Sequence, residues 1–389
     1  MGLNILQKSK IKKGMRIFLR VDCNVPLSGR KVKEESAWRL EQTLQDIREY
    51  QKRGAIVVLA GHLGRPDGQT KLTLSLKPVA RWYEKKLGCE LSFEKNILSD
   101  KAVSRIKDLR AGSIIMLENL RFYKEEENDN YGFAKKLSRL ADIYVNNAFG
   151  VCHREHASIH AITKYLPSYA GSVVIEEVEN LSRPRAFPFV LVLGGIKLNT
   201  KMPILLKLGK EADEILVGGG VALAISSVEQ GEVLQISGVD ISRNERMLAR
   251  QVMKKFADKL VSPIDYIAIR DAKVQTILAS NLKRSDQLID IGLSTQRLFK
   301  ASVKNAKSIV YNGCLGSLVT GAESGTQSIA QALPIKNKIQ SIVGGGDTVG
   351  FLQSKNLLSH FSFVSTGGGA MLAYLAGKKL PGLEVLEKK

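Results

Sequence analysis

Repeated glycines after short apolar runs are the most informative chemical pattern in this sequence. Three triplets, in "EILVGGG", "QSIVGGGD" and "FSFVSTGGG", and two shorter exits, in "FPFVLVLGG" and "SIVYNG", all lie in the second half. Glycine inside regular structure costs about 0.5–1 kcal/mol relative to alanine. At a strand-to-helix corner it lets backbone N–H groups approach a phosphate, beside the positive end of the helix dipole. Together the glycines predict a nucleotide site, although any single triplet is equally consistent with tight turn packing.

Charged residues accompany two of these corners. Asp347 directly follows the triplet 344–346 and would repel a bare phosphate, but it suits a Mg²⁺ ion carried by that phosphate. Lys197 and Lys201 lie four residues apart after a Gly-Gly pair, on one face if a helix begins there. Such lysines suit phosphoryl transfer, because their positive charges can stabilise the negative charge of the phosphoryl group as it moves. A solvated surface pair of lysines is the alternative.

The apolar runs of the first half end in cationic and hydrogen-bonding side chains. These side chains are Asp22, Asn24, His62, Arg65, Arg121 and Arg154. Ligands of open parallel sheets sit beyond the carboxyl ends of the strands. We therefore expect a second site there, for a small and highly anionic substrate, and two such sites together indicate phosphoryl transfer.

The order of the segments predicts the fold. Short apolar runs alternate with segments of helical apolar spacing, such as 38–54 and 244–260, which indicates parallel sheets covered by helices on both faces. The length of 389 residues favours two domains. We predict an α/β protein with three-layer α/β/α lobes at 1–170 and 189–370. A helix and a proline-containing linker at 171–188 would join them.

Composition narrows the class of protein. No window resembles a signal peptide or a membrane span, so we expect a cytoplasmic protein with no membrane partner. Four scattered cysteines argue against a disulfide framework or a zinc ribbon. The 58 Lys and Arg against 38 Asp and Glu give a net charge of +20, which attracts anions. Because the charge is spread along the chain without aromatic interleaving, we expect no nucleic-acid partner.

The histidine-rich segment "HREHASIH" has spacing that zinc sites also use. His153, His156 and His160 lack an accompanying HExxH motif, and Arg154 between them would oppose a bound cation. We expect these histidines to serve as hydrogen-bonding groups.

Several segments, in order, resemble the phosphoglycerate kinase family from about Gly14 to the C-terminus. They are "RVDCNVP", "HLGRP", "LENLRF", "NNAFGVCHREHAS", "LGGIKLNTK", "YNG", "GGGDT" and "STGGGAMLAYLAGKKLPGL". The resemblance implies two Rossmann-like lobes joined by a hinge helix, with a C-terminal tail from about residue 371 to 389 returning to the first lobe. It also implies a monomeric glycolytic enzyme that moves a phosphoryl group between 1,3-bisphosphoglycerate and ADP with Mg²⁺, giving 3-phosphoglycerate and ATP.

The resemblance implies roles for individual residues. Asp22, Asn24, His62, Arg65, Arg121 and Arg154 would hold the glycerate and its non-transferred phosphate, with Arg39 near the transferring group. Arg39, Lys197 and Lys201 would be catalytic. The nucleotide would contact Gly195, Lys201, Gly218, Gly219, Asn312, Gly344, Gly345, Gly346, Asp347 and Thr348, with Mg²⁺ on Asp347.

The sequence also departs from the family pattern. Cys314 stands in place of a proline, Asn147 in place of an aspartate, and Val319 in place of a glutamate that binds the nucleotide ribose. Glu323 is a candidate substitute for that ribose contact, although we expect that it does not serve. One lost contact should weaken nucleotide binding by about 1–3 kcal/mol without abolishing transfer. We therefore predict a working kinase with a looser or altered nucleotide preference.

Two alternatives remain at this point. A paralogue that binds anions or nucleotides without turnover is favoured by the altered ribose loop and opposed by Arg39, Lys197, Lys201 and Asp347. A nucleic-acid-binding module would use the net charge of +20, and its binding would depend steeply on salt but not on 3-phosphoglycerate.

Overall fold

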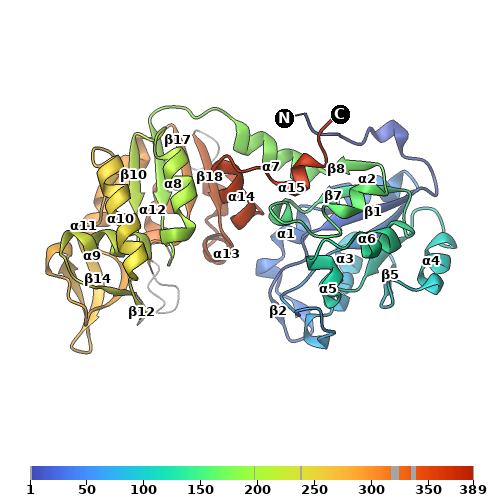
Figure 1. The fold of residues 1–389 in the computed structure, drawn as a ribbon, viewed down its shortest axis with the longest axis horizontal. Helices are drawn as coiled ribbons and strands as arrows, with labels where there is room; N and C mark the ends of the chain where they lie inside the picture. The colour runs from blue at the N-terminus through green and yellow to red at the C-terminus, as the bar shows by residue number, and fades with distance from the viewer. Residues whose placement is uncertain (1, 197, 237–238, 317–323, 334–338, 389) are drawn as a thin grey trace. The chain divides into compact units, whose positions relative to one another are not determined.

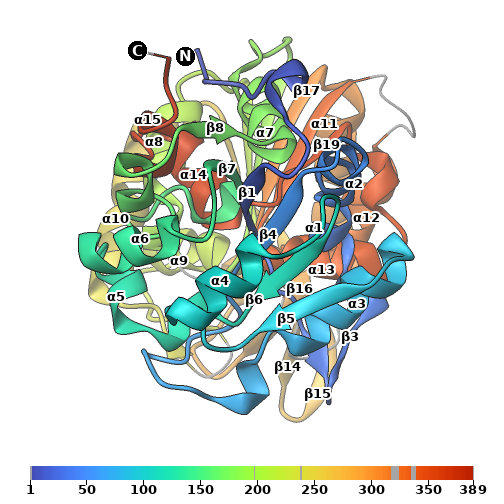
Figure 2. The same ribbon diagram turned by 90° about the vertical axis from the view of Figure 1, so that its right-hand side faces the viewer.

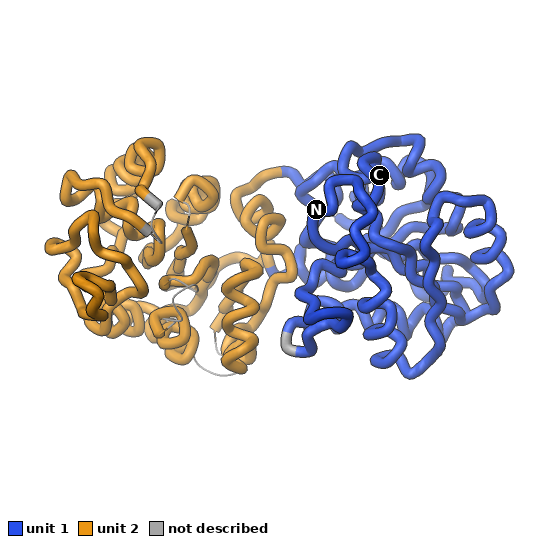
Figure 3. Tube along the Cα trace, turned by 90° about the horizontal axis from the view of Figure 1, so that it is seen from below, with its two compact units in different colours: residues 1–180, 379–389 blue, residues 181–378 orange. Residues whose placement is uncertain are grey.

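The computed structural model describes residues 2–196, 198–236, 239–316, 324–333 and 339–388. The chain forms two compact units (Figure 3). Unit 1 contains residues 1–180 and 379–389, and unit 2 contains residues 181–378. The division falls within helix α7 (Ser172–Ser182), at Asn180 and Leu181. The returning C-terminal segment begins at Lys379, later than the position near residue 371 that we expected from the sequence.

Unit 1 is built on a six-stranded parallel sheet (Figure 1). In spatial order its strands are β5 (Leu91–Glu94), β6 (Ile114–Leu117), β4 (Ile56–Ala60), β1 (Arg16–Val21), β7 (Ile143–Asn147) and β8 (Ser168–Ala170). Its main helices are α2 (Leu44–Lys52), α3 (Lys77–Leu87), α4 (Asp100–Lys107) and α6 (Tyr131–Ser138). Shorter elements are α1 (Trp38–Glu41), α5 (Lys124–Glu127), α15 (Pro381–Glu384) and the hairpin of β2 (Leu27–Ser28) and β3 (Lys31–Val32). Figure 2 shows β5, β6, β4 and β1 lying side by side.

The sheet of unit 1 is covered on both faces. Every residue of β4, β6 and β7 is buried, which is typical of parallel strands between two helical layers. Ile17 and Leu19 of β1 share a core with Ile47 of α2 and Tyr83 of α3. Two helices of unit 1, α4 and α6, begin with side-chain caps: the side chain of Asn130, for example, accepts a hydrogen bond from the backbone N–H of Phe133 at the start of α6.

Unit 2 has a second six-stranded parallel sheet. Its order is β13 (Leu260–Val261), β10 (Glu214–Val217), β9 (Phe189–Leu193), β17 (Ser308–Asn312), β18 (Gln340–Gly344) and β19 (Phe363–Val364). Its helices are α8 (Met202–Leu208), α9 (Gly219–Glu229), α10 (Arg243–Phe256), α11 (Leu293–Asn305), α12 (Ser324–Ala332), α13 (Gly346–Ser354) and α14 (Gly368–Leu375). An antiparallel sheet of β15 (Lys273–Leu278), β14 (Asp265–Arg270) and β16 (Gln287–Ile291) and the hairpin of β11 (Gln235–Ile236) and β12 (Val239–Asp240) complete it.

The predicted α/β architecture with two parallel sheets is confirmed. In each sheet, four adjacent strands end at the same edge: β6, β4, β1 and β7 in unit 1, and β10, β9, β17 and β18 in unit 2. The residues selected from the sequence follow these strands. No helix in the described part of the chain is both long enough and apolar enough to cross a bilayer.

Candidate functional site

Unit 1 brings several of the predicted residues together through the loop after β4. The side-chain oxygen of Asn24 accepts a hydrogen bond from the Gly64 N–H (3.0 Å), and the Asn24 carbonyl accepts one from Nη1 of Arg39 (3.3 Å). Asp22 accepts the backbone N–H of Asn24 (3.0 Å). Arg65, the next residue in the same loop, is exposed to solvent. Residues that follow β1 and β4 are thereby fixed at one edge of the sheet.

Arg121 is a buried cation with unused hydrogen-bonding capacity. It lies on the short helix η4 (Leu120–Phe122) after β6, and it is only 3% exposed. Its Nη1 donates to the Gly64 carbonyl (2.9 Å), and its Nε lies 3.3 Å from a carboxylate oxygen of Glu127. Nη2 has no hydrogen-bond partner among the described residues. Burial, together with the charges of Arg154 and Arg20, lowers the Arg121 pKa to about 10. An anion at this position would use the free N–H groups and relieve the repulsion.

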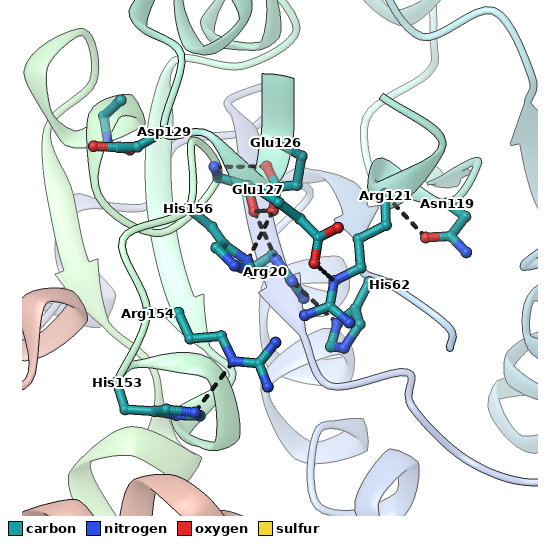
Figure 4. A network of polar contacts seen from close by, with 12 residues as sticks. Arg20, His62, Asn119, Arg121, Glu126, Glu127, Asp129, His153, Arg154 and His156 are labelled. Carbon is teal, nitrogen blue, oxygen red and sulfur yellow. Dashed lines mark hydrogen bonds and ion pairs between the residues drawn. The ribbon is translucent and has the colours of Figure 1, made fainter. Parts of the chain in front are cut away.

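Arg20 supports this cluster from inside the protein, and we did not select it from the sequence. It is fully buried at the end of β1, and its Nε donates to Oγ of Ser158 (2.9 Å). Ser158 in turn donates its N–H and its hydroxyl to the buried carboxylate of Glu126 (2.9 and 2.6 Å). Figure 4 shows Glu126 in the same polar network as Arg20. The network thus gives a buried arginine and a buried glutamate a shared partner. The signal available in the sequence was an arginine inside the otherwise apolar run "IFLRV".

Arg20 also fixes the protonation of His62. Nη2 of Arg20 lies 3.3 Å from Nδ1 of His62, and because a guanidinium only donates, Nδ1 must accept. The proton of the neutral ring is therefore on Nε2. Burial, and then the charges of Arg20 and Arg121, keep the His62 pKa well below its ordinary value. His62 is thus a neutral hydrogen-bond donor over the physiological pH range.

The three histidines of "HREHASIH" lie in separate environments. Nε2 of His153 accepts a hydrogen bond from Nε of Arg154 (3.2 Å), and Nδ1 of His160 lies 2.6 Å from a carboxylate oxygen of Asp129. His156 is buried, and burial followed by the charge of Arg121 lowers its pKa to about 3. Among the described residues, no group of three or more His, Cys, Asp or Glu side chains could hold a metal ion.

Unit 2 forms a second network at the ends of β9, β17 and β18. Nζ of Lys201 donates to the side-chain oxygen of Asn312, whose amide nitrogen donates to the Gly344 carbonyl (2.8 Å). Lys201 is only 9% exposed, and burial lowers its pKa to about 8, although Cys314 and Asp347 act in the opposite direction. The contacts join residues from three strand ends around one amine.

Several glycines of unit 2 are required for packing between loops. The N–H groups of Gly195 and Gly219 already donate to the carbonyls of Cys314 and Leu315 (2.8 Å each), and that of Gly218 donates to Leu193 (3.0 Å). A Cβ atom on Gly219 would lie 2.9 Å from the Gly195 carbonyl oxygen. These N–H groups are therefore not free for a ligand. Close packing of the loops accounts for these glycines.

The triplet at the start of α13 differs from the others. Gly345 has φ +109°, a conformation that other residues rarely adopt, and it caps a helix that begins at Gly346. The first N–H groups of a helix have no acceptor within the helix, so those of Gly346, Asp347 and Thr348 point outward from its N-terminus. The Thr348 hydroxyl accepts from the Gly313 N–H (3.1 Å), while Asp347 is exposed. This corner has the properties of an anion site.

Comparison with known proteins identifies this arrangement. The sequence model of the family described as phosphoglycerate kinase matches residues 7–378. The chain belongs to the phosphoglycerate kinase family. It is 35% identical to the phosphoglycerate kinase of Dictyoglomus turgidum, over 97% of this chain and 96% of that protein. It is therefore an enzyme that transfers a phosphoryl group, and nothing in the comparisons favours a weakened paralogue.

Solved phosphoglycerate kinases share the fold. The structure from Pyrococcus horikoshii matches with a TM-score of 0.87 at 27% identity, and the one from Coxiella burnetii with 0.81 at 32% identity. Each alignment covers 98% of this chain and 98% of the other. The likeness thus extends over both units.

Two of the residues that depart from the phosphoglycerate kinase pattern, Cys314 and Asn147, lie in the described part of the structure. The buried Cys314 lies beside the α13 corner, with its sulfur 3.8 Å from Oγ1 of Thr348. Asn147 is buried at the end of β7, where it contacts Asp46 and the start of α7. Lys197, Val319 and Glu323 lie outside the described residues, so our predictions for them remain predictions.

An apolar cleft next to the unit 2 network was not found from the sequence. It is lined by Gly219, Leu223, Tyr266, Leu288, Ile289, Asp290, Leu315 and Gly316. These residues come from four separate segments, and their apolar side chains look like ordinary core residues in the sequence. Only the fold brings them together beside Gly219.

Proposed function

We propose that this chain catalyses reversible phosphoryl transfer between 1,3-bisphosphoglycerate and ADP, as a cytoplasmic, monomeric enzyme of glycolysis. The observation that carries the proposal is the buried Arg121, whose Nη2 has no hydrogen-bond partner in the described part of the chain, at an edge crowded with cations. Asp22, Asn24, His62, Arg65, Arg121 and Arg154 would bind the glycerate and its non-transferred phosphate, with Arg39 beside the transferring group. Planar guanidinium groups bind phosphate oxygens in pairs, which fixes the orientation of the substrate.

The nucleotide would bind to unit 2. Its phosphates would contact Lys201 and the N-terminus of α13, including Gly346 and Thr348, and its base would lie against the apolar residues beside Gly219. Gly195, Gly218, Asn312, Gly344 and Gly345 would shape the surrounding loops. Lys197 would follow the migrating phosphoryl group.

Mg²⁺ is the implied metal, and the donor set fits an ion carried by the nucleotide. Asp347 is a single exposed carboxylate at the first turn of α13, so oxygen ligands from phosphate and water would complete the coordination. When bound, the ion would neutralise charge on the nucleotide phosphates. The protein would contribute orientation of the substrates, through Lys201 and Arg39. No general base is needed, because the attacking oxygen already carries charge.

Direct measurement of ATP formation tests the function. Purified protein with 1,3-bisphosphoglycerate and MgADP is expected to produce ATP, and the reverse reaction is expected to consume 3-phosphoglycerate. Absence of turnover at saturating MgADP would contradict the proposal and support the paralogue without turnover. A parallel assay with GDP would report whether Val319, in place of the ribose-binding glutamate, has altered the nucleotide preference.

The lowered pKa of Lys201 predicts a pH dependence of nucleotide binding. The protonated amine attracts phosphate, and it loses its proton as the pH rises through about 8. The affinity for metal-free ADP should therefore be constant below pH 7.5 and then fall, by up to about tenfold per pH unit above 8. Isothermal titration calorimetry from pH 7 to 9.5 measures this. Lys201→Arg is the control, because a guanidinium stays protonated and its affinity should not change with pH; equal slopes for both proteins would contradict the assignment.

Gly345→Ala and Gly350→Ala form a matched pair within the α13 region. An alanine at position 345 would have to adopt φ +109°, and its Cβ would lie 3.2 Å from the amide nitrogen of Asn312. The amide oxygen of the same side chain accepts the hydrogen bond from Lys201. We expect a loss of about 1–2 kcal/mol in stability and about tenfold weaker ADP binding. Gly350 has no atom within 4 Å of its added Cβ, so alanine there should stabilise the helix by about 0.5–1 kcal/mol. Denaturant unfolding and calorimetry compare the two; unchanged ADP affinity in Gly345→Ala would exclude the proposed role of this corner.

A further inference from the structure

The edge of unit 1 opposite the proposed substrate site gathers positive charge from three separate segments. The turns before β1, β4 and β6 meet at one atom, because the Gly54 carbonyl accepts hydrogen bonds from Gly14 N–H (2.8 Å) and Gly112 N–H (3.2 Å). All three glycines have left-handed backbones, with φ of +78°, +76° and +84° for Gly14, Gly54 and Gly112. Tight turns of this kind bring the flanking residues close together.

The flanking residues define what we call the basic surface, formed by segments 8–14, 49–54 and 107–112. Its exposed cations are Lys8, Lys10, Lys12, Lys13, Lys52, Arg53, Lys107 and Arg110. The only acidic residues in these segments are Glu49 and Asp108. Glu49 is already shared between Arg53 (2.5 Å) and Lys8 (3.8 Å), and Arg53 also donates to the Lys8 carbonyl (3.1 Å), which ties η1 (Lys8–Lys10) to the end of α2.

Helix dipoles explain only part of this charge. Lys52 and Lys107 lie at the C-termini of α2 and α4, where a cation is favourable. The four lysines of segment 8–14 cap no α-helix and, apart from the contact of Lys8 with Glu49, face solvent. They lie together because the fold places them so, not because they neutralise other groups of the unit.

We propose that the basic surface binds the phosphate backbone of double-stranded nucleic acid without regard to sequence. Closely spaced, mobile ammonium groups match the regular charges of a duplex, and such contacts supply affinity without reading bases. None of the exposed large apolar side chains of the described residues lies in the three segments, so the surface lacks the apolar residues with which a membrane-binding surface inserts between lipids. From the sequence the charge looked evenly spread, and we expected no such partner; the convergence at Gly54 is what the fold adds.

The position of the basic surface makes it independent of catalysis. The same three strands carry Asp22, His62 and Arg121 at their carboxyl ends, whereas the basic surface lies at their amino ends. A duplex bound there would leave the proposed substrate site open, and binding should be insensitive to 3-phosphoglycerate.

Fluorescence anisotropy with a labelled 20-base-pair duplex of arbitrary sequence tests the proposal. The wild-type protein should bind with a dissociation constant of about 10⁻⁴–10⁻⁶ M, and the affinity should fall steeply between 50 and 200 mM salt. The triple variant Lys10→Glu, Lys12→Glu and Lys13→Glu should bind at least about tenfold more weakly, with a salt slope smaller by about 2–3. Its phosphoryl-transfer activity should be unchanged.

A control of equal charge change separates the surface from the overall charge of +20. Lys254→Glu, Lys304→Glu and Lys307→Glu reverse three exposed lysines of unit 2 and should weaken binding less than about threefold, as should Arg121→Met in the proposed substrate site. Equal losses in both triple variants would overturn the proposal, as would loss of binding in Arg121→Met. Binding to phosphatidylserine vesicles but not to the duplex would overturn it as well.

Discussion

Replacing Arg121 by methionine is expected to abolish tight binding of phosphoglycerate and, at the same time, to make the protein more stable. The guanidinium is 3% exposed, it lies near Arg154 and Arg20, and its pKa is lowered to about 10. A buried charge that lacks full compensation destabilises the fold, and replacing such a group by an apolar side chain of similar volume is often neutral or favourable. Glu127, its ion-pair partner, is 34% exposed in its side chain and can be solvated by water after the substitution.

We expect Arg121→Met to raise the free energy of unfolding by about 1–2 kcal/mol, after allowance for solvent screening. Loss of a charge-assisted contact with phosphate should raise KM for 3-phosphoglycerate by about 10²-fold. Urea unfolding and steady-state kinetics measure the two effects. Arg48→Met is the control: Arg48 is an exposed arginine that donates to the Lys86 carbonyl, so both quantities should stay near the wild-type values. A loss of stability in Arg121→Met would show instead that Arg121 serves the fold.

The sequence predicted the residues at the carboxyl ends of the strands better than the buried hydrogen-bond networks that support them. Reading the residues that follow each apolar run was enough to select Asn24 and Arg121, which the structure joins through the loop at Gly64. This worked because parallel strands end at a common edge. Arg39, which donates to the Asn24 carbonyl, was selected only through the resemblance to the family. Arg20 and Glu126 were missed because their link runs through Ser158, which is 138 residues from Arg20 in the sequence. Long-range partners of this kind leave no local pattern.

The glycines show the same limit. Each Gly-rich corner follows a strand, so the sequence alone could not separate glycines that approach a ligand from glycines that approach another loop. The distinction depends on which atom lies next to each glycine. A Cβ on Gly313 would lie 2.2 Å from the Gly194 carbonyl oxygen, in another loop, whereas Gly345 caps α13. The apolar cleft beside Gly219 was equally invisible, because its lining consists of ordinary core residues from distant segments.

Asn147→Asp is expected to destabilise unit 1 by about 2–4 kcal/mol at pH 8, although the phosphoglycerate kinase family usually has aspartate at this position. In this chain Nδ2 of Asn147 donates to Oδ2 of Asp46 (2.8 Å), and Oδ1 of Asn147 accepts the N–H of Val173 (2.8 Å). The same Oδ2 of Asp46 accepts the N–H and the hydroxyl of Ser172 (2.9 Å each). Both side chains are buried, and an aspartate at position 147 would place two carboxylates in contact.

The pH dependence of this loss gives its cause. Burial already raises the pKa of Asp46, and a second carboxylate would raise it further, so that the folded variant must hold a proton that the unfolded chain releases near pH 4. A pKa raised in the folded state means that stability is lost as the pH rises and is regained as it falls. Relative to wild type, the variant should therefore recover by up to about 1.4 kcal/mol per pH unit between pH 8 and pH 5. Urea unfolding at several pH values measures the recovery.

The double variant Asp46→Asn with Asn147→Asp exchanges the two side chains. It tests whether the loss of stability comes from two carboxylates in contact or from the aspartate at position 147 itself. An asparagine at 46 can accept from Ser172 and donate to the new carboxylate, and the carboxylate at 147 can accept the N–H of Val173, so the double variant should lie within about 1 kcal/mol of wild type. A double variant as unstable as Asn147→Asp, or a loss that does not change with pH, would contradict this explanation. Ser172 and Val173 are the first residues of α7, the helix within which the chain passes from unit 1 to unit 2. The identity of residue 147 therefore depends on residue 46, and the asparagine is a substitution matched to its partner, which keeps the start of that helix in place.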